Sequence, residues 1–161
     1  MNKNSNKDAA ETANQAHQLP DVLDNNIPYQ INRLGHRINR RLEVDLQRIG
    51  LSVSAWRVLA VLDFNASVSV NELARFVMIE QSTLSRLLQR MEADGLIDRG
   101  TSRRDGRFRE IRLTALGQSE YEKAREIALK HIGQIVDGFS SVEQAQFLSF
   151  VKRLQGNVEN R

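Results

Sequence analysis

The sequence contains no cysteine. This absence excludes disulfide bonds, thiolate zinc sites, iron–sulfur clusters and peroxide sensing through a thiol. Long apolar runs are also missing, because the longest one, Val58 to Leu62, is far shorter than the roughly 20 residues that cross a bilayer. The first six residues are polar, so we expect no secretory signal, no membrane partner and a cytoplasmic protein.

Patterns typical of enzymes are missing too. No glycine-rich phosphate loop follows a predicted strand, and no group of residues has the spacing of metal ligands. The histidines, His17, His36 and His131, are scattered, and none accompanies a nucleophile with a neighbouring base. The sequence therefore predicts no catalytic residue, no bound metal and no cofactor.

A local excess of arginine is present instead. The 161 residues are 40% apolar and 27% charged, which is typical of a globular protein, and the net charge is only +3. The segment from Leu96 to Leu113 contains six arginines and three acids, so its net charge equals that of the whole chain. Such a patch indicates a polyanionic partner such as nucleic acid, although surface arginines also cluster by chance.

Most of the remaining chain is predicted to be helical. Residues 1–24 are polar and lack sustained periodicity, which is typical of a flexible tail. Apolar residues at steps of three and four predict a long helix from about Asp24 to Gly50. Three further helices are predicted to begin after the capping residues Ser52, Ser69 and Thr114, and a last helix is predicted to begin with Ser140 and Ser141. Ser69 with Glu72 has the spacing of a capping box for a short helix, Val70 to Val77.

Another helix and a β-hairpin occupy the middle of the chain. The helix is predicted from about Gln81 to Asp94, and Gly95 ends it. Two strands follow, Leu96–Gly100 and Phe108–Leu113, and in the second of them apolar and charged residues alternate. The predicted fold class is therefore mainly α with a small β-hairpin.

The helix from Gln81 has one apolar and one polar face. Four apolar side chains fall within about 100° of arc and form the expected buried stripe: Leu84, Leu87, Leu88 and Met91. Hydroxyl, guanidinium and amide groups occupy the opposite face: Ser82, Arg86, Gln89 and Arg90. Such groups form hydrogen bonds with base edges and phosphates in the major groove, but the same face is also typical of an ordinary solvated helix.

The hairpin loop favours the DNA-binding interpretation. It contains Arg103, Arg104 and Arg107, whose guanidinium groups can enter a narrow minor groove. Asp105 lies within reach of these arginines and can brace one of them through a charge-assisted hydrogen bond. A polar-faced helix followed directly by an arginine-rich loop predicts a winged helix-turn-helix that binds duplex DNA.

Two sequence patterns resemble those of the MarR family of regulators. Asp105-Gly106-Arg107, followed by Leu113-Thr114-Ala115-Leu116-Gly117, fits the pattern Asp-x-Arg, five residues, Leu-Thr-x-x-Gly. The upstream segments Ser82–Arg86 and Met91–Ile97 fit as well, and the resemblance covers about Ile27 to Leu154. The middle position of Asp-x-Arg is glycine rather than a bulkier, often basic residue, so we expect a looser loop tip with slightly weaker phosphate contacts.

The resemblance implies an obligate homodimer that represses from a palindromic operator in double-stranded DNA and is released by a small ligand, commonly an aromatic acid. It also implies the residues that contact DNA. The helix supplies Ser82, Thr83, Ser85, Arg86, Gln89 and Arg90, and the wing supplies Arg107 with Asp105 as its brace. The loop itself adds Arg103 and Arg104 as candidate DNA-binding residues.

Apolar helix faces outside the DNA-binding lobe favour the dimer as well. Three segments carry them: Ile31–Ile49, Tyr121–Phe139 and Phe147–Leu154. Together they offer more apolar surface than one small lobe can cover, although a monomer with a second helical core remains an alternative. We therefore predict a winged helix-turn-helix lobe at residues 51–113 and a dimerisation region at residues 25–50 and 114–161.

The effector site and two other functions stay open at this point. His36, Arg37, Arg40 and Trp56 are candidates for binding an aromatic acid, because a guanidinium pairs with a carboxylate and an indole covers a ring. Trp56 fits a core position equally well, and the other three fit a surface or an interface. The alternatives to a sequence-specific regulator are a non-specific architectural DNA-binding protein and a winged helix used for protein contacts.

Overall fold

The computed structural model describes residues 20–65, 68–101 and 109–159 and divides the chain into two units, Met1–Arg41 and Leu42–Arg161. The first unit contains the single helical turn α2, Asp21–Asp24, and most of α3, Ile27–Gln47. Of the predicted tail, residues 1–19 lie outside the described residues. The prediction was wrong for its last residues, because α2 forms directly after Pro20, whose fixed φ suits the start of a helix.

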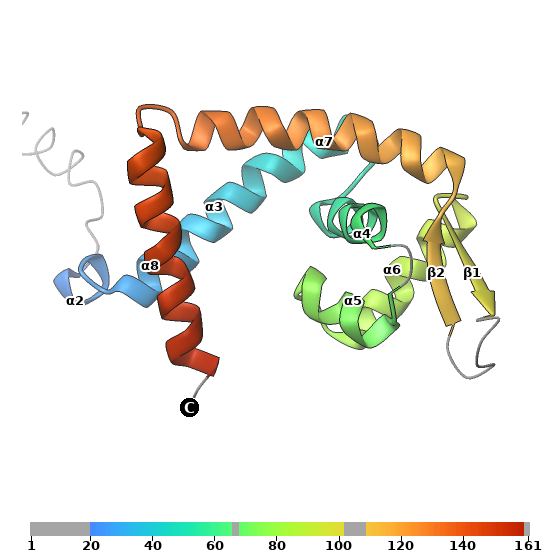
Figure 1. Ribbon diagram of the computed structural model, residues 1–161, viewed down its shortest axis with the longest axis horizontal. Coiled ribbons are helices and arrows are strands. Elements are labelled where there is room, and N and C mark those ends of the chain that lie inside the picture. Colours follow the sequence, from blue (N-terminus) through green and yellow to red (C-terminus); the bar gives the residue numbers. More distant parts are fainter. Residues whose placement is uncertain (1–19, 66–67, 102–108, 160–161) are drawn as a thin grey trace, which may run out of the picture. The chain divides into compact units, whose positions relative to one another are not determined.

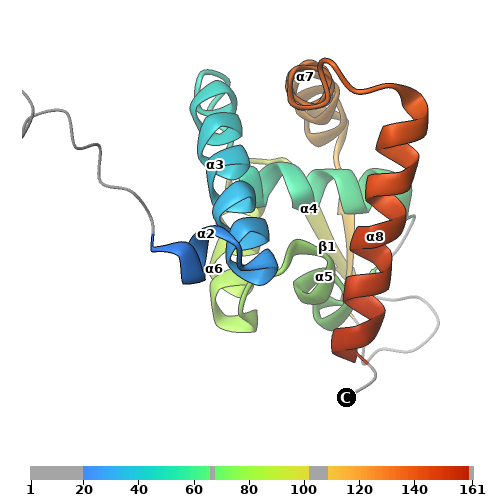
Figure 2. The same ribbon diagram turned by 90° about the vertical axis from the view of Figure 1, so that its left-hand side faces the viewer.

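The second unit contains the remaining elements, which Figure 1 colours along the chain. They are α4 (Val53–Phe64), α5 (Val70–Val77), α6 (Gln81–Ala93), β1 (Ile97–Thr101), β2 (Arg109–Leu113), α7 (Ala115–Ile135) and α8 (Ser141–Glu159). In both views α5 and α6 lie on the same side of α4 (Figures 1 and 2). The mainly helical fold with one antiparallel hairpin is confirmed. No helix within the described ranges is long and apolar enough to cross a membrane.

Local capping signals set the first residues of α4 and α5. The Ser52 hydroxyl accepts a hydrogen bond from the Ala55 amide at 3.1 Å. At α5, the Ser69 amide donates to Glu72 Oε2 at 3.0 Å, and the Glu72 amide donates back to the Ser69 hydroxyl at 3.3 Å. Hydrogen bonds from Ser69 hold the pKa of the Glu72 carboxyl below its usual value. The predicted capping box is therefore confirmed, and α5 begins and ends at the predicted residues.

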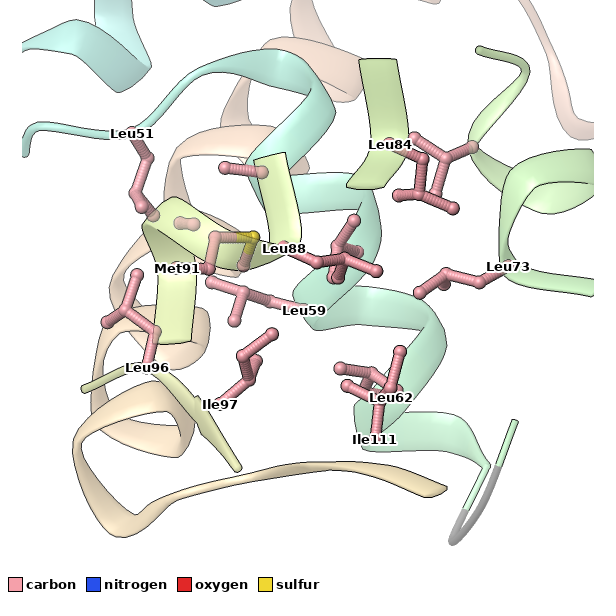
Figure 3. Packing of buried hydrophobic residues seen from close by; sticks show 14 of the residues in the cluster. Leu51, Leu59, Leu62, Leu73, Leu84, Leu88, Met91, Leu96, Ile97 and Ile111 are labelled. Carbon is pink, nitrogen blue, oxygen red and sulfur yellow. The ribbon is translucent and has the colours of Figure 1, made fainter. Parts of the chain in front are cut away.

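The hydrophobic core of the second unit surrounds α4, which packs against α5, α7 and β2. Figure 3 shows leucines of α4, α5 and α6 meeting Ile97 and Ile111 of the hairpin. The largest fully buried side chains are Leu46, Val58, Leu59, Leu73, Val77, Leu84, Leu88 and Ile111. This core therefore holds one face of α6 and one face of the hairpin around α4.

Asp63, near the end of α4, connects α4 to α7. Its Oδ1 accepts a hydrogen bond from Gln118 Nε2 at 2.8 Å, and its carboxylate also accepts one from Tyr121. Burial, followed by the charge of Asp63, raises the pKa of the Tyr121 hydroxyl. The hydrogen bond between Asp63 and Gln118 therefore connects the two helices.

Large apolar side chains of α7 and α8 remain exposed. The sequence predicted one continuous apolar side from Tyr121 to Phe139, but the structure buries Ala124 and Ala128 and ends α7 at Ile135. Beyond Ala128 the large apolar side chains are 38–56% exposed: Leu129, Ile132, Ile135 and Phe139. No residue of α8 is buried, and its exposed apolar side chains are Val142, Phe147, Leu148, Phe150, Leu154 and Val158. We call these two sets together the α7–α8 apolar surface.

The turn after α5 holds Met78 in the left-handed region, at φ 59° and ψ 45°. A side chain with a Cβ costs about 1–2 kcal/mol in this conformation, whereas glycine adopts it freely. Met78 is 71% exposed, so its side chain contributes little packing. We expect Met78→Gly to raise the free energy of unfolding by about 0.5–1 kcal/mol, as measured by urea denaturation. Met78→Ala keeps the Cβ and should bring no gain; an equal gain in both variants would contradict this explanation.

Candidate nucleic-acid interface

The helices α5 and α6 form a helix-turn-helix in which both ends of α6 are held. At its N-terminal end, Gln81 Nε2 donates a hydrogen bond to Asn71 Oδ1 of α5 at 2.9 Å. At its C-terminal end, Gly95 has a φ of 72°, and the Leu96 amide donates to the Met91 carbonyl at 2.9 Å. This is the hydrogen bond of a Schellman motif, in which glycine ends a helix. The direction of α6 is therefore fixed relative to α5.

The two faces of α6 differ as the sequence predicts. Leu84, Leu88 and Met91 are at most 2% exposed and point into the core (Figure 3). Five of the six predicted contact residues of α6 are exposed: Ser82, Thr83, Arg86, Gln89 and Arg90. Gln81 and Glu92 are exposed polar residues of the same helix. Two positions differ from the prediction: Leu87 is half-buried rather than fully buried, and Ser85 is half-buried rather than exposed. Both lie at the borders between the apolar and polar faces.

Arg86 and Arg90 lie one helical turn apart on the exposed face of α6. Within the described part of the chain, neither forms an ion pair. Their guanidinium groups are accompanied by the exposed hydroxyl of Ser82 and the exposed amide of Gln89. This face can therefore donate to phosphate oxygens and can both donate to and accept from base edges.

The hairpin forms in the predicted place. Its register pairs Ile97 with Leu113 and Arg99 with Ile111, and its strands begin one residue later than predicted. The loop at 102–108 lies outside the described residues. With it lie the predicted wing residues Arg103, Arg104, Asp105 and Arg107, whose roles stay predictions.

Thr114 and Gly117 join the hairpin to the ends of α6 and α7. The Thr114 hydroxyl accepts a hydrogen bond from the Gly117 amide at 2.9 Å and donates one to the Gly95 carbonyl at 2.6 Å. The Thr114 amide donates to the Leu96 carbonyl at 3.1 Å. A Cβ at position 117 would overlap the same Leu96 carbonyl oxygen, so only glycine fits. The Leu-Thr-x-x-Gly pattern therefore meets a packing requirement of this junction.

An ion pair between Arg99 of β1 and Glu92 of α6 was missed by sequence reasoning. Arg99 Nε lies 3.3 Å from Glu92 Oε2, and the Arg99 side chain is only 15% exposed. The sequence prediction placed Arg99 in the surface arginine patch, which is wrong for this residue. Arg99 lies opposite the fully buried Ile111, and the same register could have indicated its core-facing side.

The predicted effector residues are divided between the two units. His36, Arg37 and Arg40 are exposed on α3 in the first unit, whereas Trp56 belongs to α4 in the second. Trp56 is half-buried against the core, which is the alternative that the sequence left open. Its indole Nε1 is buried and has no hydrogen-bond partner among the described residues. An effector site made of these residues stays a prediction.

Comparisons with known proteins point to one family. The model of the MarR family matches residues 49–107, which include α4, α5, α6 and β1. The chain is similar to the HTH-type transcriptional repressor IacR of Pseudomonas putida, at 26% identity over 99% of both chains. It is also similar to the transcriptional activatory protein BadR of Rhodopseudomonas palustris, at 26% identity over 81% of this chain and 75% of BadR.

A solved structure has the same fold over most of its length. It is the MarR-family transcriptional regulator from Silicibacter pomeroyi, which is 29% identical and superposes with a TM-score of 0.76. The superposition covers 88% of this chain and 96% of that one, so it includes helices outside the helix-turn-helix. The family match, the relatives and the fold agree in what this chain is similar to, which is the MarR family of winged helix-turn-helix transcriptional regulators.

Proposed function

We propose that this chain is a sequence-specific DNA-binding transcriptional regulator. The observation that carries the proposal is the exposed polar face of α6, whose opposite face is fixed in the core by Leu84, Leu88 and Met91. A helix held in this way can enter a major groove without losing its place in the fold. The naming of IacR as a repressor supports repression as the direction of regulation, whereas the naming of BadR as an activator makes activation the alternative.

The proposed regulator acts as a homodimer on a palindromic operator. The α7–α8 apolar surface supports this, because a single chain leaves these large side chains exposed to water. A two-fold dimer would place two α6 helices in major grooves about one helical turn apart. The wings, with Arg103, Arg104, Asp105 and Arg107, would reach the flanking minor grooves.

A small aromatic acid is the proposed effector. The support is chemical: Arg37 and Arg40 are exposed cations that can pair with a carboxylate, and Trp56 has a buried indole N–H without a partner in the described part of the chain. His36 is the fourth candidate. Release of DNA would require that the acid binds more tightly to a dimer whose α6 helices no longer match the groove spacing.

Fluorescence anisotropy on DNA tests the proposed function. The full chain is titrated onto the DNA upstream of its own gene and onto a scrambled duplex, over a series of salt concentrations. A preference above about 10³ for the upstream DNA would establish a sequence-specific regulator and provide a probe for screening aromatic acids. Equal affinities that fall steeply with salt would indicate an architectural protein, and no binding to either duplex would favour protein contacts.

Variants at Gln89 and Arg107 separate base reading from phosphate contact. Gln89→Ala is expected to cost about 1–3 kcal/mol on the preferred DNA and to leave the salt dependence unchanged. Arg107→Ala is expected to weaken binding to all sequences and to reduce the salt slope by about 1. Arg125→Ala, an exposed position on α7, removes the same charge and serves as the control. A Gln89→Ala variant that weakens binding to preferred and scrambled DNA equally, as Arg107→Ala is expected to do, would contradict this division of roles.

A further inference from the structure

We infer that Glu92 and Arg99 are positioning residues that fix the wing hairpin against α6. The inference rests on the proposed function, since it concerns how two DNA-contacting elements are held in one orientation. Neither residue belongs to the predicted DNA-contacting set. Their role is to hold other groups in place.

Arg99 occupies a strand position that faces the core. Directly opposed residues of an antiparallel pair share one face of the hairpin, and Arg99 lies opposite Ile111, which is fully buried. Ile97, two residues earlier on the same face, is 2% exposed. A charged side chain beside these buried apolar residues requires a partner, and Glu92 in the last turn of α6 supplies it.

This pair gives the hairpin a second side-chain attachment to α6. The first is at its root, where the Thr114 hydroxyl donates to the Gly95 carbonyl at 2.6 Å and to the Leu96 carbonyl at 3.2 Å. Arg99 lies three residues farther along the chain, which corresponds to about 10 Å of strand. Ile97, Ile111 and the backbone bridge between Val68 and Ile111 hold the hairpin against the core, and the two attachments to α6 fix its orientation relative to that helix. The described strands of the hairpin and the polar face of α6 are thus held in one fixed relation.

The pair is poorly suited to a purely stabilising role. Glu92 keeps a side-chain exposure of 44%, and such partly solvated ion pairs contribute little to stability. Arg99 Nε and Nη2 are buried and have no hydrogen-bond partner among the described residues, so the contact is an ion pair without hydrogen-bond alignment. An apolar residue at position 99 would pack on this face without that cost. What the ion pair adds is a fixed distance between two elements.

The decisive variant is Glu92→Gln, because two explanations of Glu92 predict opposite changes in affinity for the preferred DNA. If Glu92 acts only through its charge, its removal should strengthen binding to any DNA. If Glu92 positions the wing, affinity for the preferred DNA should fall about 5- to 10-fold, whereas affinity for scrambled DNA should stay equal or rise. Asp94→Asn, an exposed acid two residues away, is the matched control and should not lower either affinity.

A second experiment, hydrogen exchange, tests the positioning role without DNA. Amide hydrogen exchange at residues 97–101 and 109–113 should be faster in Glu92→Gln and Arg99→Met than in the unaltered protein, with α4 unchanged. The double variant should be no worse than either single variant, and Arg99→Lys should recover binding to within about 2-fold of the unaltered protein.

Two results would overturn the inference. One is a Glu92→Gln variant that binds the preferred DNA as well as the unaltered protein does, and the other is unchanged exchange in the hairpin. Failure of the proposed function appears differently, as an unaltered protein that does not distinguish the two duplexes. If Arg99→Met does not fold, the half-exposed Glu92→Gln variant still decides both arms.

Discussion

Replacing Gly117 with alanine should lower the free energy of unfolding by roughly 3 kcal/mol or more. The added Cβ would overlap the Leu96 carbonyl oxygen, lie 2.9 Å from the Leu96 carbonyl carbon and lie 3.4 Å from a Leu113 methyl group. Two of these contacts are with backbone, which cannot rotate away as a side chain would. The same carbonyl accepts the Thr114 amide, so moving it also weakens the junction between hairpin and α7.

Thermal and urea denaturation measure this loss, which corresponds to a decrease in Tm of about 6–12 °C for a chain of this size. Gly133→Ala is the matched control because it lies in the same helix, where a Cβ would meet no atom within 4 Å. The control should gain about 0.5–1 kcal/mol from the higher helix propensity of alanine. A Gly117→Ala variant as stable as the Gly133→Ala variant would show that Leu96 is not held as tightly as the structure indicates.

Introducing charge into the α7–α8 apolar surface should convert the proposed dimer into monomers. Ile132→Glu combined with Phe147→Glu places two carboxylates on side chains that are 51% and 58% exposed in the single chain. If a partner covers these positions, the buried charges lack partners and the interface is lost. Sedimentation equilibrium should then give 18.3 kDa instead of about twice that mass. Affinity for a palindromic site should fall by about 10²-fold or more, because the two half-sites are no longer bound together.

Two exposed polar positions of the same helices provide the control. Ser119→Glu combined with Gln146→Glu changes the net charge equally and should leave the mass and the DNA affinity unchanged. If the unaltered protein sediments as a monomer, the dimer proposal is wrong. If the double glutamate variant stays dimeric, the dimer forms through another surface.

Local signals in the sequence predicted the helix starts well. Ser52 and Ser69 cap helices within three residues of themselves, so no knowledge of the tertiary fold is needed to recognise them. The start of α3 was less well predicted. Asn26 accepts a hydrogen bond from the Tyr29 amide at 2.8 Å and so begins α3 after α2 rather than at Asp24. Asp24 and Asn26 can each begin a helix, and the sequence alone does not show which of the two begins α3.

The polar face of α6 was predictable because helical periodicity separates it from the apolar face. The role of Arg99 could not be predicted, because it depends on two contacts between residues far apart in the sequence. These are the register of β1 with β2 and the ion pair with Glu92. A count of arginines cannot distinguish a paired, core-facing guanidinium from a free one. Gly117 shows the same limit, since its pattern was recognised but its physical reason lies in the Leu96 carbonyl.

The Thr114 hydroxyl caps α7 by accepting a hydrogen bond from the Gly117 amide, and it donates one to the Gly95 carbonyl at the end of α6. One oxygen atom therefore bridges the two helix ends and couples their positions. We therefore expect a tilt of α7 to displace the C-terminal end of α6. In a dimer, the separation of the two α6 helices would then follow the angle between the two α7 helices. A ligand that changes this angle can alter the fit to DNA without touching any residue of the helix-turn-helix.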